Sequence, residues 1–342
     1  MTLRVGVVGT GVMGADHVRT LTTRVSGAVV TAVTDLDAGR AASVAREAGA
    51  GTRVTASGLE LITADDVDAV IIASDDASHA SLTLAAVAAG KPVLVEKPLA
   101  PTVAECRRVV DAERDVVGDG PALVHVGFMR RFDPAHVELR RAVQGGRIGR
   151  ALVAHAVHRN TRTAPGGTSE TTVTSSAIHE LDSLPWVLGS ALSEVSWHAP
   201  SAPGSLPGRA DPQVLLVRTA DGALCTVELF VNAGYGYDVR LEVAGEGGTL
   251  ALADSSLLVR NAELGRALDY PADWRPRFAE AYRAELQAWV DAIVTGRPAP
   301  DLACAADGLR AAQAADAVIA SMHAGGAPVQ VPPAPAPRVI MQ

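Results

Sequence analysis

Val5-Gly-Val-Val-Gly9-Thr-Gly11-Val-Met-Gly14 is the stretch of sequence that decides the fold. An apolar run, Leu3 to Val8, leads into three glycines with the spacing G-x-G-x-x-G, and a helical segment follows. This order is typical of the first strand, turn and helix of a dinucleotide-binding fold. Gly9 permits a tight turn, Gly11 lets the backbone approach a pyrophosphate, and Gly14 lets the helix pack closely on the strand. The helix N-terminus offers free N–H groups to the phosphates.

A carboxylate after the second apolar run indicates which dinucleotide is bound. The run Val29–Val33 is followed by Asp35, which can accept hydrogen bonds from both ribose hydroxyls and would repel a 2′-phosphate. The sequence therefore predicts NAD rather than NADP as the cofactor, with Arg40 one turn further on. The alternative is that Asp35 only caps the helix that starts near Asp37. The other predicted cofactor contacts are Val12, Met13, Ser74, His79, Glu96 and Lys97.

The composition is that of a globular protein with two domains. The 342 residues are 48% hydrophobic and 20% charged, with a net charge of −8 and a pI of about 5.6. Because phosphate binding needs clustered Lys and Arg, this balance argues against nucleic acid as a partner. No apolar run approaches the ~18 residues of a membrane span. The chain also enters a strand directly, without a signal segment.

Cysteine is scarce, and the sequence offers no convincing metal site. Cys106, Cys225 and Cys304 lack metal-ligand spacing, and we expect reduced thiols in a cytoplasmic protein. His155 and His158 are three residues apart, but they lie in a predicted strand with no cysteine partner. We expect a reaction that needs no metal.

The first third of the chain predicts a doubly wound parallel sheet, because short apolar runs alternate with Ala-rich helical stretches. The expected strands are 3–8, 29–33, 68–73, 92–95 and 122–127. The expected helices are 12–24, 37–48, 78–89 and 101–117. Residues 1–125 are therefore interpreted as an NAD-binding Rossmann domain of the α/β class, with its ligand at the carboxyl ends of the strands.

After Pro134 the pattern changes to that of an α+β domain with an open, mostly antiparallel sheet. The expected strands are Arg150–His158, Gln213–Thr219, Ala223–Val231, Asp238–Ala244 and Leu250–Val259. The expected helices are 134–145, 175–188, 275–295 and 302–323. We assign residues 126–331 to substrate binding and oligomerisation, and 332–342 to an extended, Pro/Ala-rich arm. Because helices cover one face of such a sheet, we expect a dimer or tetramer that covers the other.

A lysine follows the strand expected at residues 92–95. This run continues directly into Glu96-Lys97-Pro98, which places Lys97 at the carboxyl edge of the sheet, beside the expected nicotinamide position. Pro98 can adopt a cis peptide bond, which would hold the Lys97 backbone in a sharp turn. A solvated surface lysine is the alternative. Because four buried positions precede Lys97, we favour a catalytic role.

A histidine opens a helix in the second predicted domain. In Ser175-Ser-Ala-Ile-His179-Glu-Leu-Asp182, Ser175 or Ser176 can cap the helix, and Asp182 shares a face with His179. Oxidation of an alcohol by NAD releases a proton, so a base such as histidine is needed, and a lysine cation stabilises the developing alkoxide. A structural histidine in the core is the alternative. We expect Lys97 and His179 to meet at the nicotinamide.

With these residues, the chain resembles the glucose–fructose oxidoreductase and inositol dehydrogenase family over nearly its whole length, most closely the inositol 2-dehydrogenase branch. The matching segments are Glu96-Lys97-Pro98, Val126-Gly-Phe-Met-Arg-Arg-Phe-Asp133, His158-Arg-Asn160, Ile178-His179-Glu-Leu-Asp182, Asp211-Pro-Gln213 and Val231-Asn-Ala-Gly-Tyr-Gly-Tyr-Asp238. The resemblance implies that Lys97 and His179 form a catalytic pair. It also implies that Arg130, Asn160 and either Tyr235 or Tyr237 shape a polyol pocket. Arg130 can instead pair with Asp133, Asn160 can cap a turn, and the tyrosines can belong to the core.

Two positions depart from the family pattern. Ser175 stands four residues before His179, where the family usually has an aspartate. Either Asp182 or Glu170 compensates for the missing charge at the substrate, or the substrate differs, or the activity is low. Pro185 lies in the helix that carries His179, and proline costs ~3 kcal/mol in a regular helix. We therefore expect a kink or a new turn at Pro185.

The sequence thus predicts an NAD-dependent dehydrogenase that acts on a cyclitol or sugar, with myo-inositol and its 2-keto product as the simplest case. The nearest alternative is a sugar dehydrogenase or keto-sugar reductase of a biosynthetic pathway. A non-catalytic sensor of NAD and sugar is the alternative from another class. Ser175 is the feature in favour of either alternative, whereas the presence of both Lys97 and His179 argues against a sensor.

Overall fold

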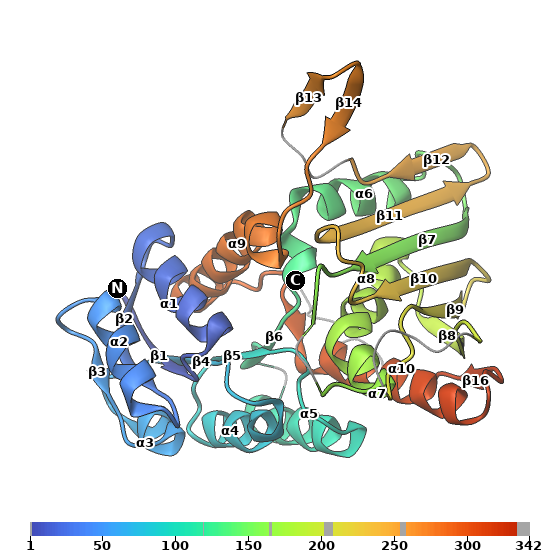
Figure 1. Ribbon diagram of the computed structural model, residues 1–342. Coiled ribbons are helices and arrows are strands. Elements are labelled where there is room, and N and C mark those ends of the chain that lie inside the picture. Colours follow the sequence, from blue (N-terminus) through green and yellow to red (C-terminus); the bar gives the residue numbers. More distant parts are fainter. Residues whose placement is uncertain (1, 119, 164–165, 202–207, 254–257, 334–342) are drawn as a thin grey trace. The chain divides into compact units, whose positions relative to one another are not determined.

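Leu3–Val8, the first apolar run, forms strand β1 near the middle of a mostly parallel sheet (Figure 1). The computed structural model describes residues 2–118, 120–163, 166–201, 208–253 and 258–333. The strand order is β15-β6-β5-β4-β1-β2-β3, and only the edge strand β15 is antiparallel to its neighbour. The strands are β1, β2 (Ala28–Thr34), β3 (Arg53–Val54), β4 (Ala69–Ile72), β5 (Val93–Glu96), β6 (Val124–Gly127) and β15 (Ala303–Cys304).

Helices cover both faces of this sheet, as expected for a Rossmann domain. They are α1 (Val12–Arg24), α2 (Ala38–Ala48), α3 (Gly58–Thr63), α4 (Asp76–Ala88), α5 (Val103–Val117) and the short 3₁₀ helix η1 (Met129–Phe132). The predicted strands and helices of this part are confirmed to within a few residues. The two-residue strand β3 and the short helix α3 were not predicted, because neither is long enough to give a periodic pattern.

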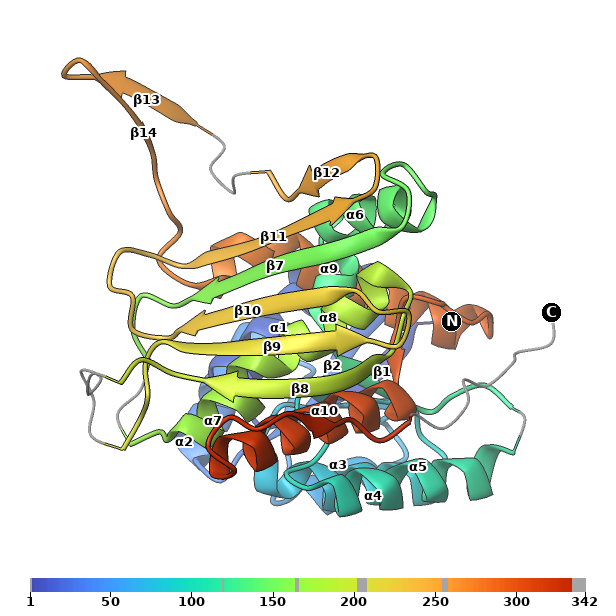
Figure 2. The same cartoon turned by 90° about the vertical axis from the view of Figure 1, so that its right-hand side faces the viewer.

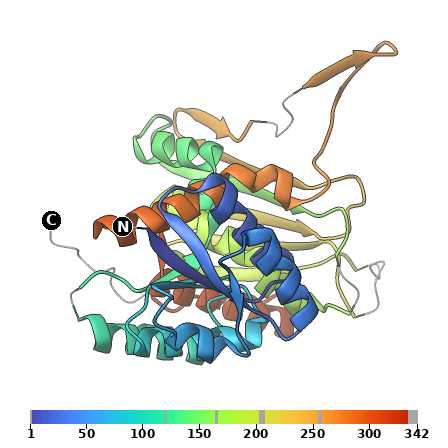
Figure 3. The ribbon, with the colours of Figure 1, turned by 90° about the vertical axis from the view of Figure 1, so that its left-hand side faces the viewer.

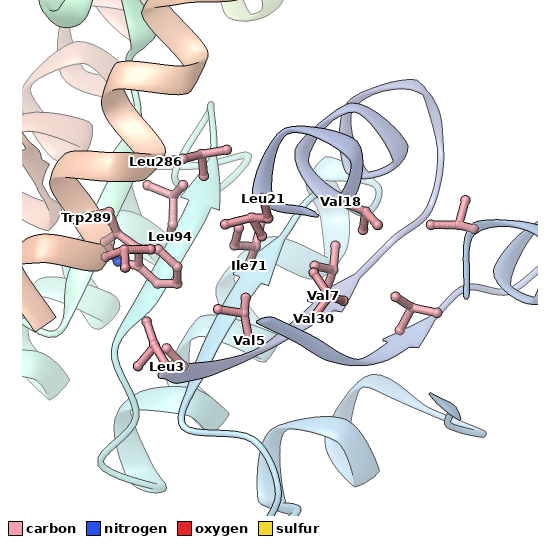
Figure 4. Close-up of a cluster of buried hydrophobic side chains, with 14 of the residues drawn as sticks. Leu3, Val5, Val7, Val18, Leu21, Val30, Ile71, Leu94, Leu286 and Trp289 are labelled. Carbon is pink, nitrogen blue, oxygen red and sulfur yellow. The ribbon is translucent and has the colours of Figure 1, made fainter. Parts of the chain in front are cut away.

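A segment far along the chain completes the first domain. Residues up to Phe132 form one compact unit together with Glu280–Ala312. Leu286 and Trp289 of α9 (Trp274–Thr295) pack against Leu3, Ile71 and other apolar side chains of the sheet (Figure 4). Figure 3 shows the orange α9 beside the blue α1, and the ion pair of Arg24 with Glu280 joins these helices. The predicted domain boundary at residue 125 did not assign Glu280–Ala312 to the first domain.

The second compact unit contains Asp133–Ala279 and the stretch from Gln313 onward. Its sheet has the order β12-β11-β7-β10-β9-β8-β16, and every pair is antiparallel except β7 with β10. The strands are β7 (Ala151–Arg159), β8 (Leu192–His198), β9 (Gln213–Thr219), β10 (Leu224–Phe230), β11 (Asp238–Gly245), β12 (Gly248–Ala251) and β16 (Val329–Gln330), with a separate hairpin of β13 (Val259–Ala262) and β14 (Gly265–Leu268). The helices are α6 (Pro134–Gln144), α7 (Ser169–Thr172), η2 (Val173–Ala177), α8 (Ile178–Leu188) and the end of α10 (Ala305–His323).

Figure 2 looks onto the sheet face opposite to α6 and α8. No helix in the described part of this unit crosses in front of β7, β10 and β9. Burial alternates along β9 and β10, with one face of each strand buried and the other partly exposed. The expected open sheet with one face covered by helices is confirmed.

Three details of the second unit correct the sequence analysis. The predicted strand Leu250–Val259 is wrong, because β12 ends at Ala251 and β13 begins at Val259. Ser175 and Ser176 do not cap the helix of His179: the helical segment starts earlier, where Thr168 and Thr171 form a capping box. Pro185 lies inside α8, which continues to Leu188. The strand β8 was not predicted, and the arm expected at 332–342 lies outside the described residues from 334 onward.

The cysteines are free thiols, as expected. Burial raises the pKa of both Cys106 and Cys225 to about 12, and that of Cys304 to about 11.

In the described part of the chain, no helix has the length and apolarity to cross a membrane.

Asp133, the N-cap of α6, is buried in a cluster with His136 and Arg277. Its carboxylate accepts from His136 at 2.6 Å and from Arg277 Nη1 at 2.7 Å. Burial by itself raises the pKa of Asp133, but these two bonds outweigh it and hold the pKa well below its ordinary value. This lowered pKa means that the charged carboxylate stabilises the fold above the unfolded pKa, and that the contribution is lost as the pH falls.

We expect Arg277→Ala to lower the stability of the protein by about 3 kcal/mol near neutral pH, because it leaves a buried carboxylate without its arginine partner. Below about pH 4 the difference from the parent should shrink as Asp133 becomes protonated. Urea unfolding at a series of pH values measures both effects. Arg275→Ala, which breaks an exposed pair with Asp273, is the control and should cost less than about 1 kcal/mol. An equal cost for the two variants would contradict this account.

Candidate active site

The loop after β1 has the geometry that a bound dinucleotide requires. Gly9 has φ of +88°, and a Cβ there would lie 2.5 Å from Ala73 O after β4. A Cβ on Gly14 would lie 1.8 Å from Gly9 O, so only glycine allows this approach of helix to turn. Around Gly11, in contrast, no described atom lies within 4 Å of the Cβ position. The space over Gly11 is therefore open to a ligand at the N-terminus of α1.

Apolar side chains beside this loop are exposed in a way that suits a bound adenosine. Leu36 is completely exposed, and Val12 is 64% exposed. Val12 directly follows Gly11, and Leu36 directly follows the carboxylate residue Asp35 at the end of β2. Together with the open space over Gly11, these exposed apolar side chains fit a dinucleotide.

Asp35 follows β2 and accepts hydrogen bonds through both oxygens. Oδ2 accepts from the N–H and hydroxyl of Thr10, and Oδ1 accepts from Asp37 N–H and Arg40 Nη2. Burial favours a raised pKa, but the bonds from Asp37, Thr10 and Arg40 outweigh it and lower the pKa of Asp35 to about 2. The N-cap of α2 is Asp37, so Asp35 is not merely the cap of that helix.

Two buried histidines hold the turn that carries Lys97. On one side, His17 Nε2 of α1 lies 2.8 Å from Glu96 Oε1, and Glu96 Oε2 accepts from Lys97 N–H at 3.3 Å. On the other side, the imidazole of His79 donates to the carbonyl of Pro98, with Nδ1 and O 2.7 Å apart. The Lys97–Pro98 peptide bond is cis, as expected.

The predicted cofactor residues fall into two groups by environment. The glycines, Val12, Met13 and Asp35 line the loop and the end of β2. His79 is buried between the carbonyls of Pro98 and Ser74, and Glu96 is buried against His17. His17 was missed by the sequence analysis, although a histidine three residues after Gly14, on the inner face of α1, is a recognisable signal.

In the second unit, His179 lies one residue into α8, directly after the π-helical turn η2. Its ring centre is 6.3 Å from that of His158 on β7, and His158 Nδ1 lies 3.1 Å from Glu180 Oε2. The ring of Tyr237 contacts His158 edge to face, with centres 5.9 Å apart. All four side chains are buried by more than nine-tenths. The result is a compact buried group centred on His158, which contacts the ring of His179, the carboxylate of Glu180 and the phenol of Tyr237.

Of the two tyrosines left open by the sequence, Tyr237 belongs to this group. Tyr235 is 45% exposed, and its hydroxyl donates to Asp238 and accepts from Arg159. Asn160 follows β7, and its buried Oδ1 has no hydrogen-bond partner among the described residues. This acceptor is available to a hydroxyl of a ligand.

The remaining predicted substrate residues lie in different settings. Arg130 is in η1 of the first unit and is buried. Asp133, its suggested alternative partner, binds His136 and Arg277. Asp182 is buried in α8, whereas Ser175 is exposed in η2 and donates to Thr171 O. Glu170 pairs with His323 at the surface, and this bond lowers the pKa of Glu170 to about 2. Of the two carboxylates considered as compensation for Ser175, only Asp182 is therefore buried beside His179.

Residues 3–117 match the NAD-binding Rossmann-fold domain of an oxidoreductase family, and residues 140–331 match the C-terminal alpha/beta domain of the same family. The chain belongs to the glucose–fructose oxidoreductase and inositol dehydrogenase family. It is an NAD-dependent dehydrogenase that acts on a CH–OH group.

Proteins similar to this dehydrogenase match over the full length of both chains. Inositol 2-dehydrogenase 2 of Paenarthrobacter aurescens is 52% identical, over 97% of this chain and 99% of the relative. Inositol 2-dehydrogenase 2 of Saccharopolyspora erythraea is 47% identical, over 98% of each. The crystal structure of myo-inositol dehydrogenase from Lactobacillus casei in complex with NAD(H) and myo-inositol is 33% identical and covers 100% of each chain, with a TM-score of 0.93.

Proposed function

We propose that this dehydrogenase oxidises a secondary hydroxyl of a cyclitol, with myo-inositol to 2-keto-myo-inositol as the reaction. The observation that carries the proposal is the full-length similarity to the Lactobacillus casei structure that holds NAD(H) and myo-inositol. The buried group of His158, His179, Glu180 and Tyr237 supports it, because a ring with many hydroxyls needs convergent polar partners in a shielded place.

In the proposed mechanism, His179 takes the hydroxyl proton and Lys97 stabilises the negative charge that develops on the oxygen. NAD, when bound, accepts the hydride. Thr10, Asp35 and the glycine loop would hold the cofactor. Glu96 and His79 hold the Lys97 turn. Arg130, Asn160, Asp182 and one of the two tyrosines, preferably Tyr237, bind the remaining hydroxyls.

The test is NADH formation at 340 nm from NAD and a panel of inositol isomers and pyranoses. We expect myo-inositol to give the highest kcat/KM. A panel in which no cyclitol or sugar reduces NAD would overturn the proposal. Preference for a pyranose would instead support the alternative of a sugar dehydrogenase. Ser175 is the feature of the sequence that favours this alternative.

Ser175→Asp tests whether the serine changes specificity. The position is exposed in η2 and four residues before His179, so a carboxylate fits there without burial. We expect the variant to raise kcat/KM for myo-inositol by about tenfold, because a carboxylate accepts hydroxyl bonds more strongly than serine does. Ser175→Asn, of similar size but neutral, is the control. No difference between the two variants would mean that the charge at this position is irrelevant to substrate binding.

We also propose that the open face of the second unit's sheet is covered by another copy of the chain. Val214 and Leu216 of β9 and Phe230 of β10 point to this face, and Leu216 is 38% exposed. Sedimentation should show a dimer or tetramer at micromolar concentration, and Leu216→Glu should weaken it. A stable monomer for the parent chain would contradict the proposal.

The scarcity of cysteine supports a cytoplasmic location.

A further inference from the structure

The carboxylate of Asp35 is already saturated by donors from its own chain. Three of its four bonds come from Thr10 and from the backbone of Asp37, which are fixed by the loop and by the start of α2. The fourth comes from Arg40, whose Nη2 lies 2.9 Å from Oδ1 and whose side chain is 49% exposed. A ribose hydroxyl that binds Oδ1 must therefore displace or share the bond of Arg40, because the other donors cannot move away.

Arg40 changes the charge that the cofactor's ribose meets. A lone carboxylate repels a 2′-phosphate, but a guanidinium in direct contact offsets much of that charge. The backbone of Arg40 is fixed in the first turn of α2, where its N–H donates to the side chain of Asp37. The guanidinium is thus held at the ribose end of the site, and its planar set of donors matches a phosphate.

We propose that Arg40 is a specificity-determining residue for the cofactor, and that it narrows the preference for NAD over NADP. When NAD binds, Asp35 receives the ribose and Arg40 moves aside. When NADP binds, Arg40 leaves Asp35 and pairs with the 2′-phosphate. The protein therefore discriminates against NADP less strongly than Asp35 alone would dictate.

The test compares the binding of NADH and NADPH, which differ only in the 2′-phosphate, by fluorescence titration of the protein without substrate. In Arg40→Gln we expect the Kd of NADPH to rise by about tenfold, while that of NADH changes by less than about threefold. Arg46→Gln, at an exposed position in the last turn of the same helix, is the matched control and should change neither. Equal effects of Arg40→Gln on the two cofactors, or none on either, would overturn the proposal.

A second pair of variants tests the role of Arg40 without Asp35. In Asp35→Asn the guanidinium is released from the carboxylate, and we expect NADPH to bind at least about tenfold more tightly than to the parent. Part of this gain comes from removing the carboxylate that repels the 2′-phosphate, so the double variant Asp35→Asn with Arg40→Gln should keep only that part and bind NADPH at least about threefold less tightly than Asp35→Asn. Equal binding of NADPH by the single and the double variant, or no gain in Asp35→Asn, would overturn the proposal. The inositol reaction does not enter these titrations, so their outcome is independent of the proposed substrate.

Discussion

Replacing His179 with alanine is expected to lower kcat by about 10²–10⁴-fold, the usual contribution of a positioned general base. The side chain lies at the start of α8 within the buried group of His158, Glu180 and Tyr237. Since the substitution removes the group proposed to take the hydroxyl proton, the residual rate should rise with pH as hydroxide replaces the base. NADH binding should change little, because the cofactor loop lies in the other unit.

The measurement is steady-state kinetics with myo-inositol across a pH series, together with NADH titration and circular dichroism of the folded variant. His323→Gln is the control, because it removes an exposed histidine of the same unit that pairs with Glu170. A kcat within about tenfold of the parent would leave His179 without a catalytic role. A parallel loss of NADH binding would indicate a structural one.

The second large effect is expected for Lys97→Met, which keeps the length of the side chain and removes its charge. Loss of a group that stabilises developing negative charge typically costs about 10²–10³-fold in kcat. The turn itself should survive, because Glu96 with His17 and Pro98 with His79 hold it through contacts that do not involve the ammonium. The loss should therefore appear in kcat more than in the Kd of NADH.

Lys91→Met is the matched control for Lys97→Met. Lys91 precedes the other end of β5, and its ammonium donates to Ala64 O at 2.6 Å. This variant should retain full turnover even if it is slightly less stable. If the two variants have the same kcat, the contribution of Lys97 is to folding and the mechanism proposed above is wrong.

Much of the first domain follows from local sequence patterns. The strand, the glycine loop and α1 could be predicted because Gly9 and Gly14 stand where a Cβ would clash with the backbone, as the 1.8 Å between a Cβ on Gly14 and Gly9 O shows. The position of Asp35 at the end of β2 could be predicted because it follows an apolar run of strand length. The bond from Arg40 could not be foreseen, since it depends on a rotamer rather than on spacing.

The parts that were missed depend on contacts between distant residues. Nothing local in Ala303–Cys304 indicates that it pairs with β6. The start of the helix before His179 was misplaced because serines close to the histidine imitate a cap, whereas Thr168 forms the capping box further upstream. Likewise, Tyr235 and Tyr237 are two residues apart in the connection between β10 and β11, and only the fold separates the exposed one from the buried one.

The return of α9 and β15 to the first domain has a consequence for biosynthesis. While the ribosome is still making the second unit, the nascent Rossmann sheet lacks Trp289 from its core and has an uncovered edge at β6. An open strand edge and an unfilled apolar surface are the features that promote aggregation of incomplete chains. The first third of the chain therefore cannot complete its sheet and core until residue 304 has been made. A gene fragment that stops at residue 125 should yield an insoluble product.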